Sequence, residues 1–190
     1  MDYRDLVQRL KELLSQRGLW TTPMQRGLIK AAVLVPLLIK EGGLSVLLVK
    51  RAKNLPHHPG EVSFPGGRCE EGDNSLEEAA LREAYEEVGL DPKDVQVVGR
   101  LNDVVTTTRF LVSPFVGVIP YPYPFRPNEE VEEVLLVPLC AFKEHKAERR
   151  LYRGQETLFY QVQGHTVWGA TAKILTELVG LLSAARFLCT

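Results

Sequence analysis

The sequence predicts an α+β fold built around a mixed β-sheet. Two aliphatic and β-branched runs, Ile29–Lys40 and Leu44–Arg51, are typical of buried strands. A segment near Ser75–Val88 carries helix-capping residues at both ends. The predicted strands and helices alternate without a strict βαβ rhythm, which favours mixed sheets over a doubly wound parallel sheet. The chain has 190 residues, of which 45% are hydrophobic and 25% charged, so we expect one domain over residues 1–190.

The first part of the chain predicts a helix followed by a hairpin. Residues 2–17 place their leucines on one stripe of a helix, and Asp2 stands where an N-cap belongs. The runs 29–40 and 44–51 are joined by Glu41-Gly42-Gly43, a hairpin signal. The sequence therefore places an amphipathic helix ahead of two long antiparallel strands.

The central helix has the clearest boundaries. Ser75 and Glu78 form an S-x-x-E capping box, and Gly89 stands where the helix is expected to end. A short strand at 61–64 leads into Pro65-Gly66-Gly67 ahead of it. The remaining predictions are strands at 95–101, 103–107, 110–119 and 131–137, an exposed proline-rich loop at 120–127, a helical turn at 138–144, a hairpin at 147–163 and a C-terminal helix at 168–188.

Composition and charge exclude several classes of protein. The chain has 23 Lys+Arg and 24 Asp+Glu, whereas a dedicated nucleic-acid binder is strongly basic. It has no apolar run near the ~18 residues that span a membrane, and its first residues lack the features of a signal peptide. Its three cysteines form no CxxC pair, which argues for a reducing compartment and against zinc. We expect a cytoplasmic protein without nucleic-acid or membrane partners, and the sequence leaves its oligomeric state open, a homodimer included.

Three glutamates share one face of the central helix. Because each residue of a helix turns by about 100°, Glu83, Glu86 and Glu87 lie on the same face. A solvated acidic face is the ordinary explanation of such a trio. The opposite face, expected to anchor the helix to the core, carries Leu81, Ala84, Tyr85 and Val88, and the small Ala79 and Ala80 are expected to leave docking space one turn earlier.

The charge pattern favours a metal site over a solvated face. Glu83 and Glu87 are like charges at i,i+4 spacing, which destabilises a helix. Arg82 is expected to pair with Glu86 and Glu78, and no basic residue of the helix stands where it would relieve the Glu83–Glu87 repulsion. A divalent cation with a preference for carboxylate oxygens, Mg²⁺ or Mn²⁺, would relieve it.

A glycine pair adds to this pattern. Gly66-Gly67 follows a predicted strand and lets the backbone turn sharply and approach another group closely. Its amides or carbonyls can then face a metal or a phosphate. A Gly-Gly pair alone is usually a simple turn, but its fixed distance from the glutamate helix strengthens the metal–phosphate interpretation.

These residues resemble the Nudix box, G-x5-E-x7-R-E-U-x-E-E-x-G-U, in which U is aliphatic. The match runs from Gly67 to Leu90. Ala84 replaces one aliphatic residue, Asp73 replaces the first glutamate, and eight residues rather than seven separate Asp73 from Arg82. The coenzyme A diphosphatase subfamily has the same Asp and the same extra residue. It also has a similar upstream signature, which here is Leu47-Leu48-Val49-Lys50-Arg51 … His58-Pro59-Gly60-Glu61-Val62-Ser63-Phe64-Pro65-Gly66-Gly67. With Val167–Ala172, the resemblance covers roughly residues 30–180.

The resemblance implies a Nudix fold, a mixed β-sheet sandwiched between α-helices. It also implies hydrolysis of a nucleoside diphosphate linked to another group, dependent on Mg²⁺ or Mn²⁺. Glu83 and Glu87 are the expected metal ligands, and Glu86 is a further ligand or orients water; which carboxylate accepts the proton stays open. Gly67 is expected at the metal. Asp73 and Arg82 are expected to brace the loop against the helix. Substrate contacts are expected from Arg51, Arg68, His58 and Gly66. Alternative carboxylate ligands are available in the later loop at Glu129, Glu130, Glu132 and Glu133.

Three functions are compatible with these motifs. The first is a coenzyme A or acyl-CoA diphosphatase that releases 3′,5′-ADP and 4′-phosphopantetheine, as the continuous signature implies. The second is a broader hydrolase of ADP-ribose, dinucleotides or oxidised nucleotides. The third is a non-catalytic domain that senses a nucleotide, against which the intact glutamate trio counts.

Overall fold

The computed structural model describes residues 2–144 and 147–188. Its main sheet has eight strands, and the central path runs β3-β2-β1-β7-β5. Strands β1 and β7 run parallel while the other pairs are antiparallel, so the sheet is mixed as predicted. The strands are β1 (Ile29–Lys40), β2 (Gly43–Arg51), β3 (Val62–Ser63), β4 (Gly66–Arg68), β5 (Gln96–Arg100), β6 (Val104–Val105), β7 (Phe110–Val118) and β8 (Val131–Pro138).

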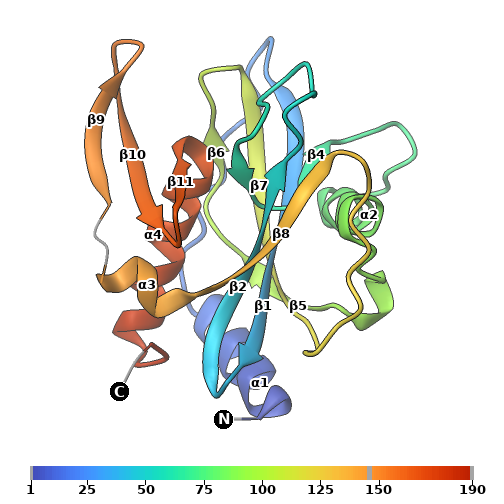
Figure 1. The fold of residues 1–190 in the computed structure, drawn as a ribbon, viewed down its shortest axis with the longest axis vertical. Helices are drawn as coiled ribbons and strands as arrows, with labels where there is room; N and C mark the ends of the chain where they lie inside the picture. Colours follow the sequence, from blue (N-terminus) through green and yellow to red (C-terminus); the bar gives the residue numbers. More distant parts are fainter. Residues whose placement is uncertain (1, 145–146, 189–190) are drawn as a thin grey trace.

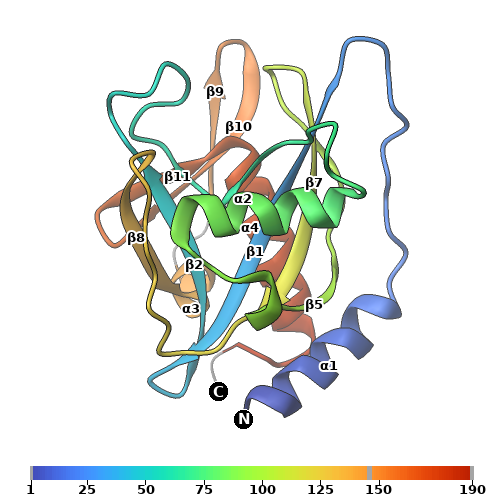
Figure 2. The ribbon, with the colours of Figure 1, turned by 90° about the vertical axis from the view of Figure 1, so that its right-hand side faces the viewer.

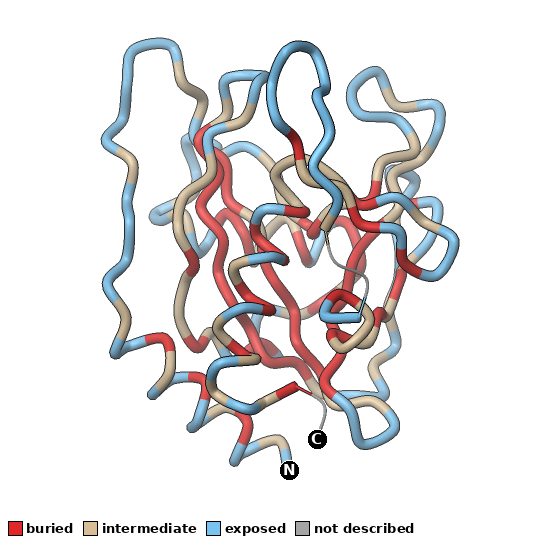
Figure 3. Tube along the Cα trace, turned by 90° about the vertical axis from the view of Figure 1, so that its left-hand side faces the viewer, coloured by how far each residue is buried: buried red, intermediate tan, exposed pale blue. Residues whose placement is uncertain are grey.

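Helices cover both faces of this sheet, which confirms the α/β/α arrangement. Figure 2 shows α2 (Leu76–Val88) in front of the sheet and α4 (Gly169–Ala184) behind it. Helix α1 (Tyr3–Ser15) packs with α4 in one apolar cluster, and α2 belongs to the other. The long strands of the sheet are buried between the two clusters, while the loops at both ends are exposed (Figure 3).

A second, three-stranded sheet stands beside the main one (Figure 1). It follows the short helix α3 (Leu139–Glu144) and consists of β9 (Glu148–Tyr152), β10 (Gln155–Val162) and β11 (His165–Trp168). The predicted hairpin over 147–163 is therefore present, but β11 was not predicted. None of the helices within residues 2–144 and 147–188 is long and apolar enough to cross a membrane.

Several predicted boundaries are wrong by a few residues. The N-terminal helix covers Tyr3–Ser15 rather than 2–17, with Asp2 as its N-cap accepting from the Asp5 N–H. The C-terminal helix ends at Ala184 rather than at 188, because Arg186 adopts a left-handed backbone with φ of 58°. Strand β6 holds two residues instead of the five predicted at 103–107.

Residues 120–127 form the predicted exposed loop, in which five of the eight residues are exposed and none is buried, although two aromatic side chains reach the core. Tyr123 and Phe125 pack against the apolar cluster beneath α2. The Arg126 N–H donates to the Val88 carbonyl at 2.8 Å, and the Asn128 N–H donates to the Glu87 carbonyl at 2.9 Å. This loop therefore fixes the C-terminal end of the helix that carries the glutamates.

Candidate active site

Strand β4 lies against β1 so closely that its first residue must be glycine. Gly66 pairs with Val33, and Gly67 pairs with Ala32. A Cβ at Gly66 would lie 2.4 Å from the Ala32 carbonyl oxygen and 2.7 Å from the Val33 Cα. The strand therefore brings the backbone of the glycine pair into the space between β1 and α2.

The carboxylate of Glu83 lies directly on the backbone of Gly67. A Cβ at Gly67 would be 2.5 Å from Glu83 Oε1 and 2.6 Å from Glu83 Cδ. Burial raises the pKa of Glu83, and hydrogen bonding and charge from Arg82 oppose that rise. The second glycine thus leaves room for a carboxylate that is removed from much of its solvent.

Glu87 is the most deeply buried carboxylate of the trio, with 4% of its surface exposed. Its Oε2 accepts from the Gly66 N–H at 3.3 Å, and its Oε1 lies 3.9 Å from Arg51 Nη1. Burial and the charge of nearby Glu83 together raise its pKa to about 8, although Arg51 and the Gly66 hydrogen bond oppose the rise. Arg51 Nε is itself buried without a hydrogen-bond acceptor among the described residues, so this arginine has a donor to spare.

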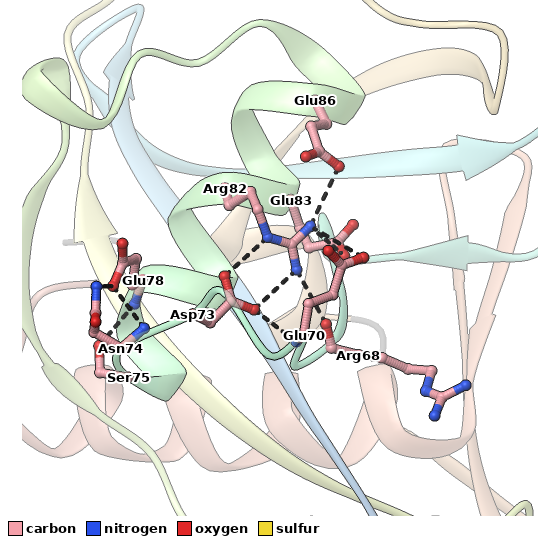
Figure 4. A network of polar contacts seen from close by, with 9 residues as sticks. All are labelled: Arg68, Glu70, Asp73, Asn74, Ser75, Glu78, Arg82, Glu83 and Glu86. Carbon is pink, nitrogen blue, oxygen red and sulfur yellow. Dashed lines mark hydrogen bonds and ion pairs between the residues drawn. The ribbon is translucent and has the colours of Figure 1, made fainter.

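Arg82 connects the loop after β4 to helix α2 (Figure 4). Its Nε and Nη2 donate to the two oxygens of Asp73 at 2.9 and 3.1 Å, and Nη2 also donates to the Arg68 carbonyl at 3.1 Å. Hydrogen bonds from Arg82 hold the pKa of Asp73 below its usual range although burial opposes this. The structure thus brings together the pair expected to brace the loop against the helix.

The same guanidinium also contacts the glutamates. Arg82 Nη1 lies 3.0 Å from Glu83 Oε1 and 3.3 Å from Glu86 Oε2. The pairing with Glu86 was predicted. The prediction that no basic residue of the helix relieves the Glu83–Glu87 pair is wrong for Glu83, because the adjacent Arg82 donates to its carboxylate. The charge of Glu83 still raises the pKa of Glu87. The expected pairing of Arg82 with Glu78 is also wrong, because Glu78 accepts from Asn74 instead.

We expect Arg82→Lys to lower kcat/KM by about 10- to 100-fold, because an ammonium cannot hold Asp73 with a two-pronged contact while also holding Glu83. The thermal midpoint should fall as well. Arg149→Lys is the matched control, since the Arg149–Glu156 pair is exposed at 73% and 63% of its side-chain surfaces. Steady-state kinetics on both variants measure this effect. Unchanged kinetics for Arg82→Lys would contradict a role for the Asp73–Arg82 contact in positioning Glu83.

Two predictions about the faces of α2 are wrong. Tyr85 was expected in the core, but 56% of its surface is exposed. Ala79 and Ala80 were expected to leave docking space, but both are fully buried against the sheet. The helix packs on the sheet through its alanines and Val88. Compared with the predicted face, this buried face is rotated toward Glu87, and the glutamate is therefore buried with it.

The remaining predicted residues lie at varying distances from the glutamates. The side chain of Arg68 extends away from Glu83 and Asp73 (Figure 4). His58 pairs with Glu61 at 3.0 Å in the exposed loop between β2 and β3. Glu132 pairs with Lys50, whereas the charge of Glu130 acts on Glu87. The contact between Arg51 and Glu87 was not predicted, because it depends on how β2 is aligned beside α2.

The donors at this site fit a hard divalent cation. Among the described residues, no ready-made group of three His, Cys, Asp or Glu side chains surrounds a metal position. However, Glu83 and Glu87 are two desolvated carboxylates beside the Gly66–Gly67 backbone, and Mg²⁺ commonly binds through one or two carboxylates plus water and substrate phosphates. Glu83, Glu87 and the backbone of Gly67 would hold the ion, with Glu86 at the exposed edge. Such an ion neutralises phosphate charge and lowers the pKa of a bound water.

The pKa of Glu87 predicts how stability depends on pH when metal is removed. Unfolded Glu87 loses its proton near the ordinary value of 4.5, whereas folded Glu87 keeps it to about 8. Between these values the folded state binds more protons, so the free energy of unfolding should fall as pH rises, by a few kcal/mol in order of magnitude. Urea unfolding in EDTA from pH 5 to 8.5 measures this slope. Glu87→Gln should flatten it, and an unchanged slope in that variant would contradict the assignment.

Comparisons with known proteins identify the family of this chain. The NUDIX domain family model matches residues 28–155. An uncharacterized Nudix hydrolase NudL of Enterobacter sp. (strain 638) is 38% identical over 188 residues, covering 94% of this chain and 96% of that protein. Its counterpart in Cronobacter sakazakii is 40% identical over 179 residues, covering 89% and 92%.

Solved structures show the same fold at lower identity. An Ap4A hydrolase from C. elegans, in a binary complex, has a TM-score of 0.56 and 18% identity, covering 83% of this chain and 99% of that one. The Nudix hydrolase RenU from M. smegmatis has a TM-score of 0.55 and 20% identity, covering 85% and 90%. The matched domain and these relatives show that this chain belongs to the Nudix family of hydrolases, which act on diphosphates.

Proposed function

We propose that this Nudix hydrolase cleaves the diphosphate of coenzyme A or acyl-CoA, producing 3′,5′-ADP and (acyl-)4′-phosphopantetheine. One observation carries the proposal: the upstream signature and the Nudix box meet in space. Arg51, from the signature, points its guanidinium at Glu87, from the box, at 3.9 Å. We also propose that the enzyme works in the cytoplasm on small molecules, as its composition predicts.

The loop that carries the rest of the signature is closed at the same arginine. The Arg51 N–H donates to the Glu61 carbonyl at 2.9 Å, and the Gly60 N–H donates to the Arg51 carbonyl at 3.1 Å. Residues 52–60 therefore form a loop that begins and ends beside the buried carboxylates. A loop in this place can distinguish substrates, since loops on a rigid scaffold commonly carry specificity.

In the proposed reaction, water adds to one phosphorus of the P–O–P bridge and the other phosphate leaves. The guanidinium of Arg51, whose side chain is 22% exposed, contacts a phosphoryl oxygen and stabilises developing negative charge. Glu86, exposed at the edge of the site, orients the attacking water. Arg82 and Asp73 keep Glu83 in place during the reaction.

A substrate panel tests this proposal. The purified chain with Mg²⁺ or Mn²⁺ is given coenzyme A, acetyl-CoA, ADP-ribose and Ap4A, and products are identified by mass spectrometry. We expect 3′,5′-ADP from both coenzyme A substrates with a higher kcat/KM than for the other two compounds. Rapid turnover of ADP-ribose or Ap4A with no 3′,5′-ADP from coenzyme A would overturn the proposal.

A further inference from the structure

The loop between β7 and β8 connects two elements of the candidate active site to one another. Its residues 126–130 pass the C-terminal end of α2 on their way to β8 (Figure 2). Helix α2 supplies Glu87 and strand β2 supplies Arg51, whose charged groups lie 3.9 Å apart. The loop makes hydrogen bonds to both elements, so it can set how these two side chains are aligned.

At α2, the loop supplies hydrogen-bond donors that the helix lacks. The last four carbonyls of a helix have no partner within it. The Val88 carbonyl accepts from the Arg126 N–H at 2.8 Å. The Glu87 carbonyl accepts from the Asn128 N–H at 2.9 Å. Because the Glu87 carboxylate also accepts from the Gly66 N–H, this residue is held both at its backbone and at its side chain.

At β2, the same loop holds the residue next to Arg51. The Ala52 N–H donates to the Glu130 carbonyl at 2.8 Å. Arg51 itself lies opposite Val131, the first residue of β8, at an irregularity in the pairing of the two strands. The position of Arg51 therefore depends on where the loop places Glu130 and Val131.

Asn128 connects these two points of attachment. Its Oδ1 accepts from the Glu130 N–H at 2.9 Å, and its carbonyl accepts from the Val131 N–H at 3.2 Å. Asn is favoured in such turns because its short side chain can bond the backbone two residues ahead. Asn128 is half-buried, whereas Glu129 and Glu130 are exposed. One residue thus holds Glu87 through its N–H and shapes the turn that places Glu130 against β2.

We propose that Asn128 is a positioning residue, which aligns the Arg51 guanidinium with the Glu87 carboxylate through the turn at 128–131. This role rests on the proposed action of Arg51 at the diphosphate. Without the Oδ1 acceptor the Glu130 N–H loses its partner, so the turn and its contact with Ala52 loosen. Because a displacement of about 1 Å can cost an enzyme about 10²-fold, a small shift of Arg51 should be measurable.

The first test removes the side-chain acceptor and then restores it. Asn128→Ala should lower kcat/KM at least tenfold, with most of the loss in kcat, because Arg51 is expected to act on charge that develops in the transition state. Asn128→Asp keeps an oxygen acceptor and should stay within threefold of wild type. The kinetics use whichever substrate of the panel is cleaved fastest.

Asn102→Ala is the matched control. Asn102 Oδ1 also accepts a backbone N–H, from Trp20 at 2.9 Å, but Asn102 lies beside Glu177 of α4, the helix on the other face of the sheet from α2. Its loss should lower the thermal midpoint and leave kcat/KM unchanged.

Two further measurements separate positioning from a general loss of stability. Hydrogen exchange followed by NMR should show faster exchange of the Ala52 amide in Asn128→Ala than in wild type or Asn102→Ala. In a double-mutant cycle, Arg51→Met/Asn128→Ala should be less than twofold less active than Arg51→Met alone, because the guanidinium that Asn128 aligns is already absent.

Wild-type activity of Asn128→Ala, equal losses in Asn128→Ala and Asn128→Asp, or additive losses in the double variant would overturn the proposal. So would an Ala52 amide that exchanges at the wild-type rate in Asn128→Ala. Failure of coenzyme A as a substrate would contradict the proposed function alone, because the kinetics do not depend on that substrate.

Discussion

Glu83→Gln and Glu87→Gln should each lower kcat/KM by about 10³-fold, which corresponds to ~4 kcal/mol of transition-state stabilisation. Both side chains keep their shape but lose the charge that holds a cation. The two carboxylates lie beside the Gly66–Gly67 backbone, and burial raises the pKa of both.

The matched control for this prediction is Glu71→Gln. Glu71 lies in the loop between β4 and α2 and is exposed, so the activity of Glu71→Gln should stay within twofold of wild type. Circular dichroism should show that all three variants are folded. Near-normal turnover by folded Glu83→Gln and Glu87→Gln would contradict the metal assignment, whereas loss of turnover would reject a purely nucleotide-sensing role.

Gly67→Ala should reduce kcat/KM by about 100-fold with little effect on stability. The added methyl group would overlap the Glu83 carboxylate, whose Oε1 lies 2.5 Å from the Cβ position. Because the obstructed atoms are the end of a flexible side chain, the carboxylate can move aside and the fold can persist. Displacing a reacting group by about 1 Å costs an enzyme about 10²-fold, so the expected loss is in activity.

Two neighbouring glycines give contrasting controls. At Gly66 a Cβ would meet the backbone of β1, which cannot move aside, so Gly66→Ala should lower the free energy of unfolding by several kcal/mol. At Gly72 a Cβ meets nothing within 4 Å, so Gly72→Ala should change neither kcat/KM nor the free energy of unfolding. Denaturant titration and kinetics on the three variants separate the effects. Full activity of Gly67→Ala would show that catalysis does not depend on the observed position of the Glu83 carboxylate.

The sequence was informative wherever local chemistry determines structure. The capping box at Ser75 and the left-handed Gly89 define α2 within one residue of the prediction. The glutamate face and the Asp73–Arg82 brace follow from helical spacing and from the resemblance. These features depend on residues close together along the chain.

Features that depend on tertiary packing were not predictable. Tyr85 is apolar enough for the core, yet the sheet accepts the alanines and Val88 instead. Arg51 reaches Glu87 only because β2 pairs with both β1 and β8 and ends beside the helix.

Direct titration of Mn²⁺ tests the central claim, that Glu83 and Glu87 hold the catalytic metal, most directly. Electron paramagnetic resonance counts free Mn²⁺ in the presence of wild type, Glu87→Gln and the Glu71→Gln control. We expect wild type and Glu71→Gln to bind alike, with affinity rising from pH 6 to 8 as Mn²⁺ competes with the proton on Glu87. Glu87→Gln should bind at least tenfold more weakly. Undiminished, pH-independent binding of Mn²⁺ by Glu87→Gln would contradict the claim.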